Sequence, residues 1–382
     1  MKSNDIKPKQ KVHSERNQRV FVGLSGGVDS AVSAALLKKD GFDVTGVFIK
    51  AWTPEGYPCT WKDDRRSAMR AAAVLDIPFI TLDLEKEYKK QIVDYMIEEY
   101  RKGKTPNPDV MCNKEIKFGH FLKFALKNGA DFVATGHYCQ IFPPLKVRGG
   151  RGSYEIGQGG EVILLEGKDK NKDQSYFLWT LTQKQLKHIL FPIGHLQKEE
   201  VRKLAKQFGL PQATRKDSQG LCFLGQIDMK EFLSRYIKPK MGSVLNDKSK
   251  IIGNHNGALF FTIGERHGFT ITQKSNQEVP LYVVEKNLKN NTITVASKHL
   301  KRSLKMLSKE IKLKDVNFTQ EINNKNLSCR IRYRQEKIGC KIKISGDGTK
   351  VIFDKPQIGV SPGQSLVLYD GEICLGGAIM TQ

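Results

Sequence analysis

Short apolar runs alternate with longer stretches of helical character between Val20 and Thr135. An apolar run bounded by turn residues predicts a buried strand, whereas apolar residues at helical spacing predict a helix. On this basis we expect strands at 20–24, 44–49, 79–82 and 132–135, and helices at 31–39, 67–75, 88–100 and 116–127. Such alternation is typical of βαβ units with a parallel sheet, in which ligands bind at the carboxyl ends of the strands.

A different pattern follows this region. Residues 186–208 are helical in character with a break at Phe191-Pro192, and from about Gly242 short apolar runs lie between Gly and Asn turns. We expect strands at 259–263, 281–285, 292–296, 329–333, 341–344, 351–353 and 365–369. Short strands at this spacing predict a small β-rich module and then a β-barrel. The predicted fold class is α/β, with a parallel-sheet domain at 19–220, a central domain at 221–300 and a C-terminal β-barrel at 301–382.

Two segments lie outside this organisation. Residues 1–18 are basic, and we expect a disordered arm, because Asp5 and Glu15 argue against a secretory or transit signal. Residues 142–160 contain two prolines and a run of Gly and Arg, which predicts an exposed insertion. Neither segment has a role that the sequence indicates.

The charge balance favours a polyanionic partner. The chain has 63 Lys and Arg residues against 40 Asp and Glu residues, a net charge of +23. A field of this size attracts nucleic acid, although a lysine-rich composition alone also produces basic proteins without such a partner. No apolar stretch is long enough for a membrane span, so we expect no membrane association.

The seven cysteines are odd in number and scattered along the chain. This usage indicates a reducing compartment, and we expect the cytoplasm, although the sequence leaves an organelle open. No group of Cys and His has zinc-binding spacing, and we predict no resident metal ligands.

A candidate phosphate loop, Ser25-Gly26-Gly27-Val28-Asp29-Ser30, joins the first predicted strand to the first predicted helix. Adjacent glycines allow a tight turn whose amides, together with the helix N-terminus, bind an anion. Ser25 and Ser30 can donate their hydroxyls, and Asp29 can bind Mg²⁺. An ordinary glycine turn with a serine cap is the alternative for an isolated Ser-Gly-Gly.

Two other nucleotide motifs are absent. The spacing of glycines after Gly23 does not fit a Rossmann loop, and Gly103-Lys104-Thr105 lacks the first glycine of a Walker A loop because Glu98 occupies that position. The full hexapeptide resembles the loop of N-type ATP pyrophosphatases (PP-loop proteins, adenine nucleotide alpha hydrolase-like). This resemblance implies that residues 19–220 form an ATP-binding catalytic domain that adenylates a substrate oxygen and releases pyrophosphate.

Two cysteines have distinctive surroundings. Cys112 lies in Pro106–Lys114, where two prolines predict a stiff extended loop that brings Asp109 close to Cys112. Cys222 lies between glycines in 217–225, in a loop able to move. Neighbouring cations would favour the thiolates: Lys114 and Lys216. The alternative for either cysteine is a buried structural thiol.

The motifs together resemble one family. In chain order they are GLSGGVDS, TPNPDVMCNKEIKFG, ATGHY, KDKNKDQSYFL, DSQGLCFLG, RYRQ and SPGQS…LGG. This set resembles the tRNA-specific 2-thiouridylase family from about Val20 to the C-terminus. The two cysteine segments are the most specific part of the match.

The resemblance implies a role for individual residues. ATP would be bound by Gly23, Leu24, Ser25, Gly26, Gly27, Val28, Asp29, Ser30, Ile49 and Gly136. Asn107, Pro108 and Asp109 would contact the target base. The remaining tRNA contacts would be His137, Lys172, Asp173, Gln174, Arg332, Tyr333 and Gln364. The last three lie in the predicted C-terminal barrel, which the resemblance thus implies to be a tRNA-binding domain. Ile49 departs from the Met that is common at its position, and the segments 1–18 and 142–160 are longer than expected.

The implied activity is ATP-dependent synthesis of 2-thiouridine at the wobble uridine, position 34, of tRNA. ATP with Mg²⁺ would adenylate the C2 oxygen, because this turns a poor leaving group into a good one. A persulfide on Cys222 would supply sulfur, Cys112 would act as nucleophile by releasing hydrosulfide or by forming a disulfide with Cys222, and Asp109 would be the acid/base. The persulfide would come from a sulfur-relay protein or a cysteine desulfurase. Two rivals remain: another PP-loop synthetase, and a non-enzymatic basic RNA-binding protein.

Overall fold

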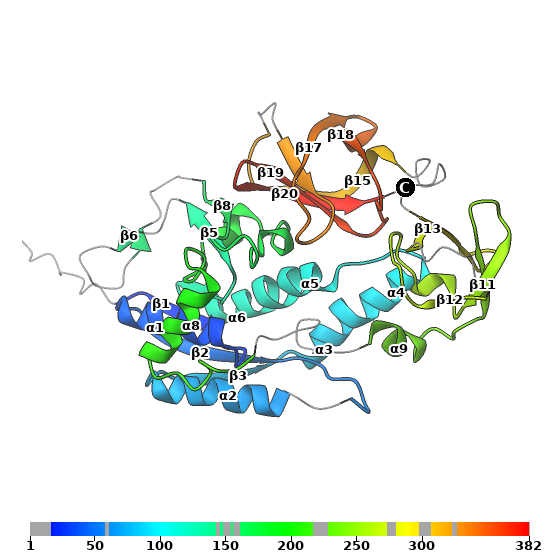
Figure 1. The fold of residues 1–382 in the computed structure, drawn as a ribbon. Coiled ribbons are helices and arrows are strands. Elements are labelled where there is room, and N and C mark those ends of the chain that lie inside the picture. The colour runs from blue at the N-terminus through cyan, green and yellow to red at the C-terminus, as the bar shows by residue number, and fades with distance from the viewer. Residues whose placement is uncertain are drawn as a thin grey trace, which may run out of the picture.

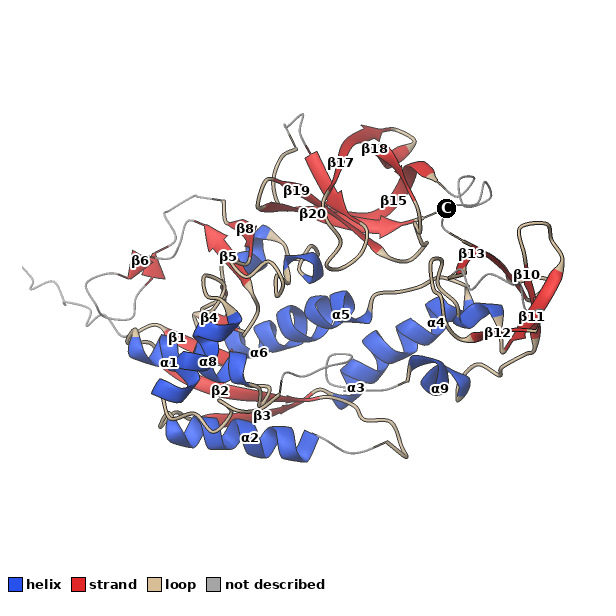
Figure 2. Ribbon diagram, in the orientation of Figure 1, coloured by secondary structure: helices blue, strands red, loops and turns tan. Residues whose placement is uncertain are grey.

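The structure is a computed structural model. It describes residues 17–57, 61–142, 146–147, 154–155, 161–216, 228–272, 280–297, 307–322 and 327–381. Three large sheets and one two-stranded sheet are present in this part of the chain, and Figure 1 shows the fold in ribbon form and Figure 2 by secondary structure. The predicted succession of a parallel sheet, a β-rich module and a β-barrel is confirmed.

The N-terminal sheet has five parallel strands in the order β3-β2-β1-β4-β9. Their bounds are β1 Arg19–Gly23, β2 Asp43–Lys50, β3 Phe79–Asp83, β4 Phe132–Ala134 and β9 Ile189–Leu190. β1 is the central strand, and six consecutive residues of β2 are buried. Such continuous burial is typical of a parallel sheet that is covered on both faces.

Helices cover both faces of this sheet. Helices α1 (Val28–Lys39), α2 (Trp61–Val74) and α8 (Lys198–Gln207) pack in one apolar core with Val20 and Val22 of β1. A second core on the other face joins Phe21 to two longer helical segments. The first comprises α3 (Glu85–Tyr88), a π-type segment (Lys89–Asp94) and α4 (Tyr95–Arg101); the second comprises α5 (Pro108–Met111), a π-type segment (Cys112–Phe121) and α6 (Leu122–Lys127).

The predicted extended loop at Pro106–Lys114 is wrong, because helix α5 begins at Pro108 and Cys112 is helical. Asn107 is extended and its side-chain oxygen accepts a hydrogen bond from the amide of Val110 at 3.2 Å, which is an N-cap. Pro108 follows at the first helical position, where the fixed φ of proline favours a helix. The two prolines therefore start a helix instead of holding a loop open.

Two further predictions of elements need correction. The region 186–208 is not one interrupted helix, because α7 (Gln183–Leu186) and α8 are separated by β9, which pairs with β4 and is buried. A two-residue strand is too short to show a period in the sequence. The strand predicted at 259–263 is replaced by a short 3-10 helix at Ala258–Phe260, which starts after Gly257 at a φ of +134°.

The central module has five strands in the order β12-β11-β10-β14-β13. Their bounds are β10 Gly242–Leu245, β11 Ile251–His255, β12 Phe269–Ile271, β13 Tyr282–Asn287 and β14 Thr292–Ala296. Val244, Phe261 and Ile293 form its small core. Helix α9 (Met229–Ser234) precedes the module and packs Phe232 into the core of the N-terminal domain.

The C-terminal sheet closes into an antiparallel barrel through pairing of its first and last strands, β15 and β20. Its strands are β15 Ser308–Phe318, β16 Leu327–Arg330, β17 Ile338–Ser345, β18 Gly348–Gln357, β19 Ser365–Asp370 and β20 Ile373–Met380. Two strands from the N-terminal half, β5 (Cys139–Phe142) and β8 (Ile163–Glu166), extend the same sheet beside β20. The barrel and the N-terminal half therefore share one sheet.

Most of the predicted basic arm and insertion lie outside the described residues. Within 142–160 the structure describes a two-stranded pairing of β6 (Lys146–Val147) with β7 (Tyr154–Glu155). Among the helices that are described, none has the length and apolar character needed to cross a membrane.

Candidate functional site

The predicted phosphate loop lies between the central strand β1 and helix α1. The hydroxyls of Ser25 and Ser30 are 3.2 Å apart, and the amide of Ser25 donates to the Ser30 hydroxyl at 3.2 Å. Gly26 has a φ of +80°, and a Cβ atom there would lie 2.4 Å from the backbone oxygen of Asp64. Only glycine fits this turn, because a side chain would meet both a strained backbone and a fixed neighbour.

The backbone of Gly136 lies directly against this loop. A Cβ atom at Gly136 would be 2.7 Å from the carbonyl carbon of Asp29 and 2.7 Å from the amide nitrogen of Ser30. Ile49 lies near the carboxyl end of β2 and is buried. The structure thus brings Gly136, which is remote in sequence, to the loop where the ATP site is expected.

Two cations beside the loop were not predicted from the sequence. The ammonium group of Lys198 lies 2.7 and 2.8 Å from the two carboxylate oxygens of Asp29, which also accepts a hydrogen bond from Tyr138 at 2.7 Å. Arg215 donates to the carbonyl of Gly26 at 2.8 Å and pairs with Asp64. Because α8 and the following turn bring Lys198 and Arg215 to the loop through tertiary packing, no sequence motif marks them.

The helix that begins at Pro108 carries the second group of predicted residues. Cys112 is fully buried, and Asp109 is half-buried one turn before it. Residues three apart on a helix are neighbours, so Asp109 and Cys112 lie on adjacent positions of one face. The side-chain amide of Asn113 donates to the backbone oxygen of Asp109 at 3.0 Å. Cys222, within 217–227, lies outside the described residues.

The barrel contacts the chain just before this helix. The side-chain amide of Gln364 donates to the carbonyl of Thr105 at 2.9 Å, and the amide of Thr105 donates to the carbonyl of Pro362 at 3.0 Å. Tyr176 donates to the carbonyl of Ser365 at 2.9 Å. Gln364, a predicted tRNA contact, therefore also fixes the backbone that leads to Asn107.

A cavity of about 470 Å³ lies between this helix and the barrel. Helix residues Asn107, Met111 and Lys114 line one side, and Lys314 and Asn317 of β15 line the other. Its volume is in the range of sites for small organic groups.

Tyr333 and Arg332 occupy the junction of three parts of the fold. The ring of Tyr333 lies 4.4 Å from that of Phe177, between centroids, in the segment that follows Gln174. The guanidinium of Arg332 donates to the carbonyl of Ile263 in the central module at 2.8 Å and to that of Gly359 at 3.1 Å. The amide of Tyr138 donates to the side-chain oxygen of Gln174 at 3.0 Å.

Two of the predicted tRNA contacts have buried side chains. His137 is 5% exposed, its Nδ1 is 2.7 Å from the Thr135 hydroxyl, and its ring packs against Phe118 and Phe191. Asp173 is 3% exposed and is bonded within the protein through both carboxylate oxygens. Both side chains are held by hydrogen bonds within the protein, and the tRNA contacts expected at these two positions stay predictions.

The stability of the protein should fall in mild acid because of His137. Burial, with Lys117 close by, holds the pKa of His137 well below its ordinary value. His137 of the unfolded chain therefore binds a proton at a higher pH than His137 of the folded protein. The neutral, buried His137 contributes fully to the free energy of unfolding above about pH 6.5, and this contribution declines below that pH. Between pH 7.5 and 5.5 we expect His137→Gln to lose about 1 kcal/mol less unfolding free energy than the wild type, as measured by urea denaturation. Equal losses in both proteins would contradict the assignment.

The fold and the loop together define the class of the protein. A glycine-rich loop at the carboxyl end of the central parallel strand, followed by a helix, is the PP-loop arrangement, and proteins of this class use ATP.

Family models match nearly the whole chain in three parts: a tRNA methyl transferase HUP domain at 18–226, a tRNA methyl transferase PRC-barrel domain at 230–297 and an aminomethyltransferase beta-barrel domain at 308–380. The tRNA-specific 2-thiouridylase MnmA of Streptococcus mutans is 44% identical over 368 residues, which are 95% of each chain. That of Lactococcus lactis subsp. lactis is 44% identical over 374 residues, 96% of each chain. The chain belongs to the tRNA-specific 2-thiouridylase family.

Two solved structures are distant likenesses of this chain. The U34-tRNA thiolase NcsA of Methanococcus maripaludis is 18% identical at a TM-score of 0.35, covering 58% of this chain and 64% of that one. A 4-thiouridine synthetase in complex with RNA and ATP is 18% identical at a TM-score of 0.32, covering 57% of this chain and 50% of that one. At these scores the likenesses carry no argument about the site.

Proposed function

We propose that this chain is an ATP-dependent tRNA 2-thiouridine synthase that acts on the wobble uridine. The observation that carries the proposal is the 44% identity to a named 2-thiouridylase over 95% of both chains. The phosphate loop at β1 and the Cys112 helix, which pack on the same parallel-sheet domain, support it. The net charge of +23 supports tRNA as the partner.

The proposed ATP site comprises the loop 23–30 with Ile49 and Gly136. Its amides and serine hydroxyls would bind the phosphates, and Lys198 and Arg215 would add positive charge beside them. Mg²⁺ would enter with the nucleotide, because it is usually bound by phosphates and one or two carboxylates. Asp29 is the carboxylate of the loop, and Lys198 would have to release one of its oxygens for a metal ion.

The proposed sulfur transfer uses two thiols and one carboxylate. The terminal sulfur of a Cys222 persulfide attacks C2 of the adenylated uridine, the C2–O bond breaks and AMP leaves. The Cys112 thiolate then attacks the inner sulfur of Cys222, which breaks the S–S bond, releases 2-thiouridine and leaves a Cys112–Cys222 disulfide for reduction by a cellular dithiol. Asp109, one turn from Cys112, is the proposed acid/base. A relay protein or desulfurase would reload Cys222.

The tRNA surface is proposed to extend from Asn107 and Pro108 over Lys172, Gln174, Arg332, Tyr333 and Gln364. Within the domain division 19–220, 221–300 and 301–382, the barrel would supply the last three of these contacts. A cytoplasmic location follows from the same proposal, since its tRNA substrate and reduced thiols are found there.

Mass spectrometry of tRNA after incubation with ATP, Mg²⁺ and a persulfide donor tests the function. The wild type is expected to convert wobble uridine to 2-thiouridine and to release AMP and pyrophosphate, whereas Cys222→Ser should release little or no thiolated tRNA and still bind tRNA. AMP release with no sulfur in tRNA would indicate another PP-loop synthetase, and tRNA binding without AMP release would indicate a non-enzymatic RNA-binding protein.

A further inference from the structure

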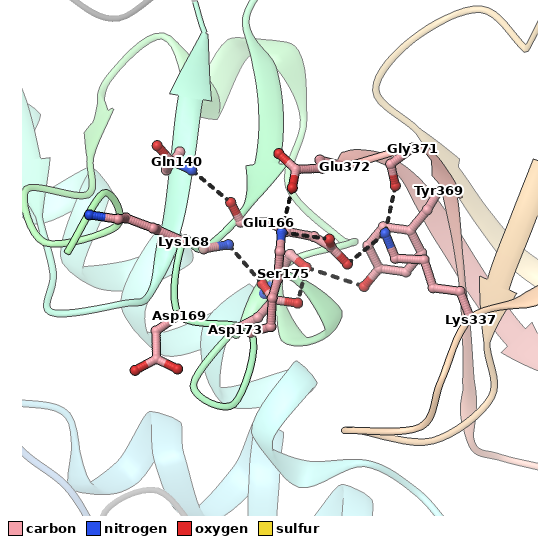
Figure 3. Close-up of polar contacts among 12 residues, drawn as sticks. Gln140, Glu166, Lys168, Asp169, Asp173, Ser175, Lys337, Tyr369, Gly371 and Glu372 are labelled. Carbon is pink, nitrogen blue, oxygen red and sulfur yellow. Dashed lines mark hydrogen bonds and ion pairs between the residues drawn. The ribbon is translucent and has the colours of Figure 1, made fainter. Parts of the chain in front are cut away.

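Five charged side chains meet where the N-terminal half joins the barrel, and we call them the junction cluster: Glu166, Lys170, Asp173, Arg330 and Lys337. Glu166 forms ion pairs with Arg330 at 3.1 Å and Lys337 at 2.8 Å, and it accepts a hydrogen bond from Lys170 at 3.0 Å. Asp173 accepts from Arg330 at 2.7 Å. Figure 3 shows Glu166, Asp173 and Ser175 on one side of this junction, and Lys337 and Tyr369 on the other.

The acids of the junction cluster are almost completely buried. The side chains of Glu166 and Asp173 are 3% and 1% exposed, and that of Arg330 is 13% exposed. Arg330 and Lys337 also lie over the ring of Tyr369, at 5.1 and 4.8 Å from its centroid. A buried ion pair usually adds little net stability, because desolvation offsets the attraction, but removal of one partner leaves a buried charge uncompensated. Such a cluster can instead fix the position of the N-terminal half relative to the barrel.

Arg330 binds two loops at once. Asp173 accepts from the amides of Gly167 and Ser175 at 3.0 and 3.1 Å, and so closes the loop 167–175. Arg330 is the last residue of β16, and its Nε donates to the carbonyl of Gln335 at 3.0 Å, which closes the loop 331–335. Its other end pairs with Asp173, 157 residues away. The ring of Tyr333 in the second loop also contacts that of Phe177, two residues after the end of the first loop.

The two loops present cations on the outside of this buried cluster. Lys168 and Lys170 on the first loop and Arg332 and Arg334 on the second are exposed. Lys168 pairs with Glu200 at 3.5 Å and Lys170 pairs with Glu372 at 2.8 Å, and Glu336 is exposed next to the second loop. Positive side chains on adjoining loops are what phosphate contacts of a nucleic acid require, and such contacts fix the orientation of the bound partner.

We propose that Arg330, Glu166 and Asp173 are positioning residues for tRNA: they touch no substrate, and they hold the loops 167–175 and 331–335 together as one tRNA-binding surface. This inference rests on the proposed function for the identity of its partner. It assigns Asp173 a role different from contact, because both its oxygens are used within the protein. ATP binding, which belongs to the loop at β1, is expected to be independent of the junction cluster.

Arg330→Met and Asp173→Asn in the full chain test the proposal. We expect each variant to bind unmodified tRNA about tenfold more weakly. A loss of this size is in the range found for residues that do not touch the ligand themselves. ATP affinity, and kcat at saturating tRNA, should stay within about twofold of the wild-type values. The combined variant should lose less tRNA affinity than the two single losses combined, because Arg330 and Asp173 share one ion pair. Arg330→Lys, which keeps a charge, should restore part of the affinity.

Asp173→Asn separates positioning from simple electrostatics. Removal of a negative charge should tighten tRNA binding if charge alone were responsible, whereas loss of positioning weakens it. Lys350→Met is the control, since Lys350 forms an exposed pair with Glu310 in the same barrel at 3.0 Å. Unchanged or tighter tRNA binding by folded Asp173→Asn would overturn the inference and leave the proposed function intact. Absence of 2-thiouridine from the wild-type reaction would overturn the proposed function instead, while the tRNA Kd would still decide the inference.

Discussion

Replacement of Cys112 by serine is expected to abolish 2-thiouridine formation while tRNA and ATP binding persist. A serine hydroxyl is not ionised at neutral pH, so the variant has no thiolate to break the Cys222 persulfide bond. Because nucleophile removal commonly costs three or more orders of magnitude, the thiolation rate should fall roughly 10³-fold or more. Single-turnover assays with persulfide-loaded protein, followed by nucleoside mass spectrometry, would measure this loss.

The control for this variant is Cys139→Ser. Cys139 is as completely buried as Cys112 but lies on β5, in the sheet shared with the barrel. Both substitutions place a hydroxyl in an apolar site, so their effects on stability should be similar. Only Cys112→Ser should lose thiolation per folded molecule. Normal turnover by Cys112→Ser would eliminate the proposed two-thiol chemistry.

Alanine in place of Gly136 should disable the nucleotide site without any change in charge. Its Cβ atom would be 2.7 Å from backbone atoms of Asp29 and Ser30, which have no side-chain freedom with which to move away. Overpacking of this kind costs about 1–3 kcal/mol, which corresponds to roughly a 5- to 150-fold loss if it falls on the ATP-bound loop. Nucleotide affinity measured by calorimetry, and pyrophosphate release, should both decline.

Gly346→Ala provides the comparison for this substitution, because a Cβ atom at Gly346 would meet nothing within 4 Å. It lies in the turn between β17 and β18 of the barrel. ATP affinity in Gly346→Ala should equal that of the wild type. Wild-type ATP affinity in Gly136→Ala would show that the loop tolerates displacement, and the proposed ATP site would then be wrong at this position.

The parts of the fold that follow a local period were predictable from the sequence. The strands β1, β2 and β3 and helix α1 have apolar spacing that depends only on neighbours in the chain, and their predicted bounds lie within three residues of the observed ones. Helix α2 begins at Trp61, six residues before its predicted start. The glycine loop was also predictable, since its conformation depends on Gly26 itself. The barrel strands β17 and β18 were recognised as short runs, but the long first strand β15, rich in Lys, was not.

What the sequence left open depends on tertiary contact. The start of the Cys112 helix is the exception, because it depends on a local cap: the side chain of Asn107 accepts from the amide of Val110, three residues on. The pairing of β8 with β20, and the ion pair of Lys198 with Asp29, join residues that are remote along the chain, and neither leaves a local pattern. The roles of Cys222, which lies in 217–227, stay predictions.

The strand pairing between β8 and β20 has an implication for how this family can change in evolution. Because the last strand of the C-terminal unit bonds to strands encoded some two hundred residues earlier, that unit cannot be exchanged between relatives as a cassette. A chimera joined after the central module would pair two strand edges that did not evolve in the same protein. Strand edges that pair poorly favour association with other chains. Recombination that preserves folding must therefore transfer the segment around 139–166 along with the C-terminal strands.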